Sequence, residues 1–504
     1  MSQAIFDQLC SHVRETALVH SIAELLEWDE RTHMPVAAGL FRADQVAYLS
    51  GWVHNRRTDP HIDEWLRELE ASPLATDLHS DSGATIRHLR RYYDKLVRLP
   101  RLLVEELTRT AVLGQQAWVE ARKKNDFAAF APLLKKTVEL KRQQAEAVGY
   151  ASCPYDALLD DYEPGETTEN VAGILRSLRQ DLVPLVGAIA SSQRRPNLTI
   201  LKRHCPRESQ EIFGKQAAAT IGFDFERGRL DVTHHPFCTE MGPDDCRITT
   251  RYDDHYFPSS FFGILHEAGH ALYDQGLRKD QYGLPPGSYV SLGIHESQSR
   301  LWENFVGRSL PFWRHFFPLM KQCFPGAIEE VPLADFYFAI NSVQPSLIRV
   351  EADEATYNLH IIIRFELEQA LINDQFSVAD LPDAWRSKYR EYLGIEPRDN
   401  AQGVLQDVHW SAGLFGYFPT YTLGNLYAAQ FFAQAESDLG SLDQSFAGGD
   451  FGGLLDWLRQ EIHQRGQCYT APELIRLVTG DTLSHQPFLA YLHQKLDPLY
   501  GITN

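Results

Sequence analysis

Helical periodicity is the feature of this sequence that most restricts its fold. Across the first 190 residues, apolar side chains recur every three or four positions, as in Ile5, Leu9 and Val13. That spacing gathers them on one face of an amphipathic helix. The breaks fall at turn-like segments such as 162–165, and no spacer rich in Gly, Ser or Pro divides the chain. We therefore expect residues 1–504 to form a single, mainly α-helical domain.

One stretch, between residues 221 and 257, departs from the helical pattern. Within its segments GFDFERGRLDVT and CRITTRY, apolar and polar residues alternate, and several residues are β-branched. Alternation with a period of two is typical of β-strands. We predict a small β-sheet near residues 221–257 and a return to helices from about residue 296.

Composition restricts the class of protein. The chain has 48 basic and 67 acidic residues, a formal charge of −19, which disfavours nucleic acid or an anionic membrane as a partner. No apolar run approaches the roughly 20 residues that span a bilayer, and the N-terminus lacks the pattern of a secretory signal. Seven scattered cysteines without a C-x-x-C pair are typical of free thiols. These features predict a soluble cytoplasmic enzyme.

The strongest helix prediction covers residues 258–276. Pro258 and the two serines after it offer a helix start with a capping side chain, and Gly276 is placed to end the helix. Within this helix, residues 266–270 read H-E-A-G-H. Because His266 and His270 are four residues apart, both imidazoles lie on one face and can bind the same metal ion.

Zinc hydrolases with this motif need a third ligand, an open position for water and a carboxylate that takes the proton of that water. Glu267 is the candidate base. The motif is not continued by G-x-x-H, so Glu296, about 25 residues after His270, is the best candidate for the third ligand. The alternatives are two histidines with ordinary polar partners, and a Glu296 that stabilises the start of its own helix. His295 is expected to contact a ligand rather than the metal, because adjacent helical residues point about 100° apart.

Several polar segments accompany this motif in a fixed order. They read H-P-F at 235–237, D-C-R-I-T at 245–249, H-E-S-Q at 295–298, I-R-V-E-A-D at 348–353 and G-V-L-Q-D-V-H-W at 403–410. With H-E-A-G-H, this collection resembles the carboxypeptidase Taq family of zinc metallocarboxypeptidases. Further likeness at 28–35, 155–165 and 416–425 extends the resemblance over most of the chain.

The resemblance implies a fold, an activity and an assembly. The fold is a large helical body with a deep active-site groove, similar to the neurolysin and angiotensin-converting-enzyme architecture. The activity is removal of single residues from the C-termini of peptide substrates, with broad side-chain tolerance and one Zn²⁺ per chain; Co²⁺ and Mn²⁺ are the alternative metals. The assembly is a homodimer.

A carboxypeptidase must also bind the terminal carboxylate of its substrate, for which a fixed cation is suited. By its place in the I-R-x-x-A-D segment, the resemblance gives this role to Arg349. An internal ion pair of Arg349 with Glu351 or Asp353 is the alternative. Arg247 is the next candidate for the carboxylate.

The oxyanion that forms during hydrolysis needs hydrogen-bond donors. The resemblance points to His409 and Tyr421, although Tyr417 could replace Tyr421, and either tyrosine could be a core residue with a satisfied hydroxyl. His235 and Arg247 are assigned to the substrate groove, and a purely structural role for each is equally open.

The leading interpretation is a zinc carboxypeptidase in which Glu267 accepts a proton from the attacking water and passes it to the leaving amine. An oligoendopeptidase could use the same metal site without needing Arg349 at the end of its substrate. A catalytically silent peptide-binding protein is a third possibility, but every residue that the chemistry requires is present.

Overall fold

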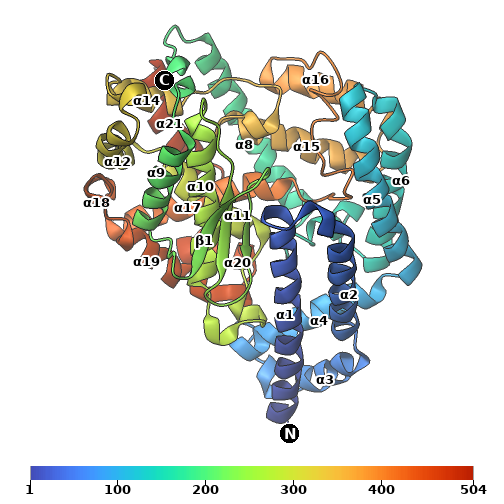
Figure 1. Ribbon diagram of the computed structural model, residues 1–504. Helices are drawn as coiled ribbons and strands as arrows, with labels where there is room; N and C mark the ends of the chain where they lie inside the picture. Colours follow the sequence, from blue (N-terminus) through green and yellow to red (C-terminus); the bar gives the residue numbers. More distant parts are fainter. Residues whose placement is uncertain (1, 503–504) are drawn as a thin grey trace.

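The computed structural model describes residues 2–502, and most of them are helical (Figure 1). The helices that precede the sheet are α1 (Ser2–Thr32), α2 (Gly39–Arg57), α3 (Pro60–Glu70), α4 (Asp81–Arg98), α5 (Arg101–Lys124), α6 (Phe127–Val148), α7 (Pro154–Leu159), α8 (Thr168–Ser191) and α9 (Arg207–Thr220). Their buried faces follow the apolar periodicity: α3, for example, buries Ile62, Leu66 and Leu69. The prediction of a mainly helical protein is confirmed.

The predicted sheet is present and has three strands. They are β1 (Gly228–Val232), β2 (Cys238–Glu240) and β3 (Cys246–Thr250), in the order β1-β3-β2. β3 is parallel to β1 and antiparallel to β2, with Cys238 opposite Ile248 and Glu240 opposite Cys246. Because directly opposed residues point to the same side of a sheet, these four side chains share one face. The sheet packs against α10.

The helices after the sheet complete the body. They are α10 (Phe257–Gly276), α11 (Leu292–Arg300), α12 (Leu310–Cys323), α13 (Pro325–Ile328), α14 (Leu333–Ile340), α15 (Thr356–Ile372), α16 (Leu381–Leu393), α17 (Pro419–Leu439), α18 (Asp443–Gly448), α19 (Gly452–Glu461), α20 (Ala471–Thr479) and α21 (Gln486–Tyr500). α10 ends at Gly276 as predicted, but the predicted serine cap is wrong. Its N-cap residue is Tyr256, so Ser259 and Ser260 lie inside the first turn of the helix, where the Ser260 hydroxyl donates to the side-chain oxygen of Gln210.

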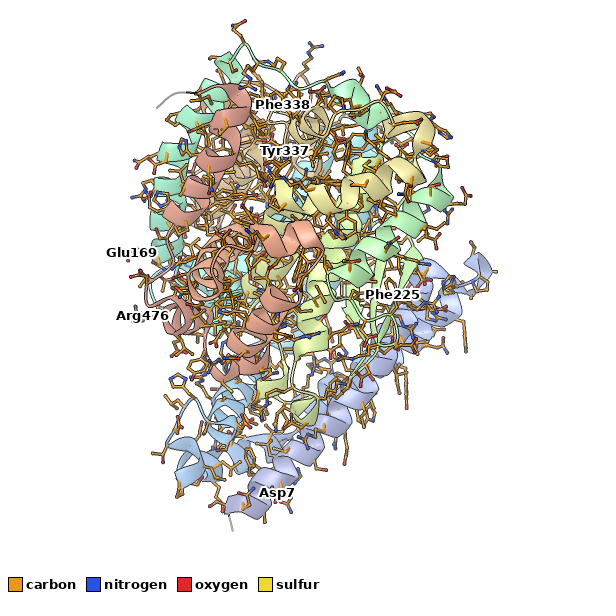
Figure 2. All side chains as sticks on the ribbon, turned by 90° about the vertical axis from the view of Figure 1, so that its left-hand side faces the viewer. Asp7, Glu169, Phe225, Tyr337, Phe338 and Arg476 are labelled. Atoms are coloured by element: carbon orange, nitrogen blue, oxygen red, sulfur yellow. The ribbon has the colours of Figure 1, made fainter. Side chains whose placement is uncertain are left out.

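Two sets of buried residues hold the molecule together. The large one extends from Ala121 to Tyr500. The small one joins α1, α3 and α4 through Leu9, Ile62, Leu66, Leu69 and Ile86. The view in Figure 2 shows the result: Asp7 lies near the narrow end formed by the first helices, and Tyr337 and Phe338 lie at the other end of an elongated body. Across residues 2–502, no helix has the length and apolar character that crossing a bilayer requires.

Candidate metal centre and active site

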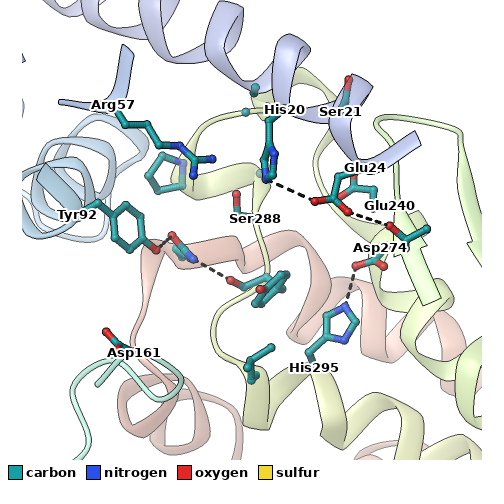
Figure 3. Close-up of a pocket in the computed structure, with 18 of the residues that line it drawn as sticks. His20, Ser21, Glu24, Arg57, Tyr92, Asp161, Glu240, Asp274, Ser288 and His295 are labelled. Carbon is teal, nitrogen blue, oxygen red and sulfur yellow. Dashed lines mark hydrogen bonds and ion pairs between the residues drawn. The ribbon is translucent and has the colours of Figure 1, made fainter. Parts of the chain in front are cut away.

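A cavity of about 1150 Å³ lies between the N-terminal helices and the central part of the molecule. One wall comes from α1 and α4, with His20, Glu24 and Tyr92 among its residues, and the facing wall comes from α10 and α11. Figure 3 shows His20 and Glu24 across the cavity from His295. A large concave site with several convergent polar groups is the usual place for a ligand.

Three predicted ligands meet at the wall formed by α10 and α11. The Nε2 atoms of His266 and His270 lie 3.7 and 3.4 Å from Oε2 of Glu296, and all three residues line the cavity together with Glu267. Four ligands arranged tetrahedrally at zinc distances are about 3.4 Å apart. Two imidazole nitrogens and one carboxylate oxygen at this spacing therefore fit one divalent ion.

Gly269 of α10 and Gly424 of α17 allow these two helices to pack closely against α11. A Cβ atom on Gly269 would lie 2.6 Å from the Cα of Ser299, and one on Gly424 would lie 2.6 Å from Cγ of Glu296. Real Cβ atoms are not tolerated at such distances, so a larger side chain at Gly269 would push α11 away. The glycine inside the H-E-A-G-H segment thus helps to bring Glu296 to the histidines.

Hydrogen bonds orient both histidines with Nε2 toward Glu296. Nδ1 of His266 lies 3.0 Å from Oε2 of Glu303. Nδ1 of His270 lies 2.6 Å from Nδ1 of His295, and Nε2 of His295 lies 2.9 Å from Oδ1 of Asp274. If each Nδ1 of the two ligand histidines carries a proton, His295 accepts from His270 and donates to Asp274, which leaves both Nε2 lone pairs free.

Electrostatics favours the protonation state of a metal ligand at His270 and Glu296. At His266, burial is outweighed by the carboxylates of Glu296 and Glu303, which raise the pKa of this imidazole. Burial lowers the pKa of His270 to about 4, which keeps its imidazole neutral. Burial opposes the charged form of Glu296, but Arg300 and the two histidines hold the pKa of this carboxyl well below its ordinary value. Burial raises the pKa of Glu267 to about 7, a value suited to a group that takes up and releases a proton.

Glu303 and Asp274 belong to this site although neither was predicted from the sequence. Glu303 lies in η6 (Leu301–Val306), a π-helical turn that continues α11, and Asp274 lies in α10. The sequence contained a signal for both residues in their helical spacing from predicted ligands. Glu303 follows Glu296 by seven residues, and Asp274 follows His270 by four. Both spacings place residues on one helix face.

Arg349 lies next to the cavity but is not one of the described residues that line it. It begins η7 (Arg349–Glu351) and is only 6% exposed. Its Nε donates to Oδ1 of Asp407 at 2.9 Å, and its Nη1 donates to the Tyr357 hydroxyl at 2.9 Å. The guanidinium carbon is 5.3 Å from the ring centre of Tyr421, a residue that does line the cavity.

The ion pair of Arg349 differs from the expected alternative. Its partner is Asp407, and not Glu351 or Asp353. The reason is that Asp353 accepts hydrogen bonds from the backbone of Gln344 and from Thr356, so it serves the start of α15. Nε of Arg364 also binds Asp407, at 2.6 Å.

The candidate oxyanion donors lie side by side. Tyr417 and Tyr421 both line the cavity, and their ring centres are 5.3 Å apart. The ring of His409 is 5.5 Å from that of Tyr417, on a segment outside the cavity lining. Burial lowers the pKa of His409 to about 4, and its Nδ1 has no hydrogen-bond partner among the described residues. The two tyrosines are thus closer to the cavity than the histidine.

The last two predicted residues, Arg247 and His235, lie outside the cavity lining. Arg247 is paired with Asp245 through two hydrogen bonds of 2.7 and 2.8 Å, and its guanidinium carbon is 4.3 Å from the ring centre of Trp28. His235 is exposed, next to Pro236 and Phe237, which line the cavity. Neither His235 nor Arg247 is itself among the lining residues described.

Comparison with known proteins decides the family. The sequence profile of the carboxypeptidase Taq (M32) metallopeptidases matches residues 8–496. The chain belongs to this family. It is 48% identical to Thermostable carboxypeptidase 1 of Thermus thermophilus, over 99% of both chains, and 37% identical to Carboxypeptidase 1 of Bacillus subtilis, over 94% and 95%. Its structure matches the M32 carboxypeptidase of Deinococcus radiodurans with a TM-score of 0.96 at 40% identity, covering 99% and 100% of the two chains.

Membership of the M32 family confirms the resemblance found in the motifs. The protein is a metallocarboxypeptidase, and its family implies a divalent metal ion. Among the described residues, two groups of three His, Cys, Asp or Glu side chains are close enough to share an ion. His266, His270 and Glu296 form one of them. Their chemistry and spacing fit such an ion.

Proposed function

We propose that this M32 carboxypeptidase is zinc-dependent and hydrolyses the C-terminal peptide bond of peptides with broad side-chain specificity. The observation that supports this proposal is the placement of His266, His270 and Glu296 around one point at the cavity wall, beside Glu267. A cavity of about 1150 Å³ exceeds what a single side chain needs, in keeping with broad tolerance.

In this proposal His266, His270 and Glu296 hold the metal. Two imidazoles and a carboxylate are a ligand set typical of catalytic zinc, with Co²⁺ and Mn²⁺ as the alternatives. When bound, zinc lowers the pKa of a water molecule and polarises the substrate carbonyl. Glu303 and the pair His295 and Asp274 fix the orientation of the two imidazoles.

Glu267 has the role of general base in this reaction. It follows His266 on the same helix and lines the cavity, so its carboxylate can take a proton from the attacking water and deliver it to the leaving amine. Tyr421 or Tyr417 would donate to the oxyanion, with His409 as a further donor behind them.

Arg349 is proposed to bind the terminal carboxylate of the substrate. Its guanidinium lies behind Tyr421 and stays charged, since Asp407, against the opposing effect of burial, raises the pKa of Arg349 well above its ordinary value. A rotation of Tyr421 away from Arg349 would open this charge to the cavity. Arg247 and His235 are proposed as groove residues that act through the neighbouring segments which line the cavity.

The remaining proposals concern assembly, architecture and location. The large apolar side chains Val36, Leu40, Phe41 and Tyr48, in η1 (Val36–Ala38) and α2, are 97, 88, 69 and 75% exposed. Such exposed groups are typical of an interface, so we propose a homodimer that uses this surface. We also propose a single domain of the neurolysin and angiotensin-converting-enzyme type, acting on peptides in the cytoplasm.

The deciding experiment measures the products of a peptide ladder by mass spectrometry. Matched peptides with free and amidated C-termini are incubated with the enzyme, with and without a chelator, and with zinc restored afterwards. We expect single residues to be released from free-acid peptides only, with loss of activity on chelation and recovery with zinc. Internal cleavage of amidated peptides would instead indicate an oligoendopeptidase, and full activity after exhaustive chelation would contradict the metal assignment.

A further inference from the structure

A second group of metal-binding side chains lies beside the catalytic centre. Cys238 of β2, Cys246 of β3 and Asp274 of α10 approach one another where the sheet packs on the helix. The two Sγ atoms are 3.7 Å apart, and each is 3.7 Å from Oδ2 of Asp274. The three ligand atoms thus form an almost equilateral triangle.

This spacing matches a tetrahedral thiolate site. With zinc–sulfur distances near 2.3 Å and zinc–oxygen distances near 2.1 Å, tetrahedral ligand atoms are about 3.6–3.8 Å apart. Cys238 and Asp274 line the cavity, so an ion can enter from it and the fourth position can take water. Glu240, on the same sheet face as both cysteines, also lines the cavity but is not close enough to belong to this group of ligand atoms.

We propose that Cys238, Cys246 and Asp274 form a second metal site, for a thiophilic d¹⁰ ion such as Zn²⁺ or Cd²⁺, distinct from the site of His266, His270 and Glu296. Thiolate ligands select soft or borderline ions, whereas the catalytic site offers nitrogen and oxygen only. Binding would displace one proton from each thiol to solvent, because only the thiolate is a ligand.

A disulfide explains the cysteine pair less well. In the antiparallel register Cys238 is opposite Ile248 and Cys246 is opposite Glu240, so the cysteines are diagonal neighbours. Diagonal Cα atoms in a sheet are about 7–8 Å apart, and disulfides rarely span more than about 6.8 Å. A disulfide also gives no reason for a carboxylate oxygen at equal distance from both sulfurs.

Asp274 connects the two sites. Its Oδ2 faces the thiols, while its Oδ1 holds His295, which in turn holds His270; Figure 3 shows Asp274 joined to His295 at the edge of the cavity. An ion on Oδ2 would weaken the acceptor that fixes His295, and therefore the orientation of His270. Occupancy of the second site should lower peptidase activity, an expectation that rests on the proposed function.

The test uses the reduced, full-length enzyme carrying one zinc per chain, titrated with Cd²⁺. Thiolate-to-cadmium charge-transfer absorption in the ultraviolet and elemental analysis are measured together. We expect one additional ion per chain with an absorption from two thiolates. Cys238→Ser and Cys246→Ser should each weaken this binding at least about tenfold. Cys205→Ser, which alters another buried free cysteine, should leave it unchanged.

Two further measurements keep the test sharp. Asp274→Asn should retain the thiolate absorption but bind Cd²⁺ more weakly, and residual peptidase activity of the serine variants checks that they fold. Absence of a second ion, or unchanged absorption in both serine variants, would overturn the proposal, as would a Cys238–Cys246 disulfide in an enzyme that takes up no extra ion after reduction. If the absorption appears but free-acid peptides are not hydrolysed, the proposed function fails and the second site stands.

Discussion

Two clusters of polar and charged side chains lie on either side of Tyr357, and they differ in how closely their groups contact one another. The metal-side cluster contains His266, His270 and Glu296, whose ligand atoms face one another at 3.4–3.7 Å. The arginine cluster contains Arg349, Arg364 and Asp407, whose opposite charges are in direct contact at 2.6–2.9 Å. Tyr357 lies between them: Arg300 stacks on its ring at 4.6 Å, and Arg349 donates to its hydroxyl.

The two clusters differ in the ligand that each is proposed to bind. In the arginine cluster two guanidinium groups share the carboxylate of Asp407, so each group contacts an opposite charge and one positive charge is left for the proposed substrate carboxylate. In the metal-side cluster the two Nε2 atoms lie 3.7 and 3.4 Å from Oε2 of Glu296, the spacing of atoms that share one ion, and we propose that a metal ion completes this cluster. The comparison predicts that substitutions in the metal-side cluster change metal content and turnover. Substitutions in the arginine cluster should instead change substrate binding and the stability of the protein.

The largest effect is expected from His270→Ala. Loss of one of three protein ligands should remove the metal at ordinary concentrations and reduce peptide hydrolysis to the level of the chelated enzyme. Elemental analysis and the free-acid peptide assay measure the two quantities. His485→Ala, which alters a histidine paired with Asp181 outside both clusters, is the matched control. Stoichiometric metal in His270→Ala would remove this residue from the site.

Glu267→Gln should separate metal binding from turnover. The amide cannot accept the proton of the attacking water, so turnover should fall by on the order of 10² or more while metal content stays the same. Single-turnover kinetics and elemental analysis test this. Glu24→Gln, a change in another carboxylate that lines the cavity, should have a much smaller effect. Near-normal turnover in Glu267→Gln would show that another group is the base.

Arg349→Ala tests whether the arginine cluster also binds the terminal carboxylate of the substrate. Removing one partner of a buried charge pair costs about 2–5 kcal/mol, so kcat/KM on free-acid peptides should fall by tens to thousands of fold with metal retained. Amidated peptides, already poor substrates, should change little. Arg364→Lys is the control, since it disturbs the same Asp407 without removing Arg349.

Two results would weigh against that role of Arg349. An equal loss on free-acid and amidated peptides, together with lower stability, would mean that Arg349 serves only to neutralise Asp407. Normal exopeptidase activity would move carboxylate recognition to another cation.

Glu303→Gln should have a smaller effect than loss of a ligand, and it should act on affinity for the metal. The neutral amide can still accept from Nδ1 of His266, but it no longer raises the basicity of that imidazole. Such changes in partners of ligands typically cost 10- to 100-fold in metal affinity. Competition with a chelator of known affinity measures this value, and an unchanged value would show that Arg300 and Arg308 already neutralise Glu303.

Spacing within one helix made part of this site predictable. The H-E-x-x-H pattern placed His266, Glu267 and His270 on α10, and the same argument would have found Asp274 and Glu303. The position of the small sheet was also predictable, because alternation and β-branched residues stand out in a helical sequence. Local sequence patterns were sufficient to predict these features because each depends on the structure of one short segment.

Contacts between distant segments could not be predicted in the same way. The wall that α1 and α4 contribute to the cavity has no motif, because it depends on where these helices pack in the folded chain. The partner of Arg349 is Asp407, 58 residues away, whereas the sequence suggested the nearer acids. The proximity of Cys238 and Cys246 depends on the register of β2 on β3. Each of these depends on tertiary packing rather than on local preference.

The smallest effect is expected from Arg247→Ala, and it sharpens the comparison because Arg247 is the alternative anchor for the substrate carboxylate. Its charge is already paired with Asp245, and its guanidinium covers the ring of Trp28, which is 5% exposed. We expect the free energy of unfolding to fall by about 1 kcal/mol through the lost stacking contact, and kcat/KM to change by no more than about threefold. Denaturant unfolding and the paired free-acid and amidated peptides measure both, and the control is Arg101→Ala, which alters an exposed arginine that is paired with Glu105 and does not line the cavity. A loss of tens of fold confined to free-acid peptides would make Arg247 the anchor and leave the arginine cluster with a structural role alone.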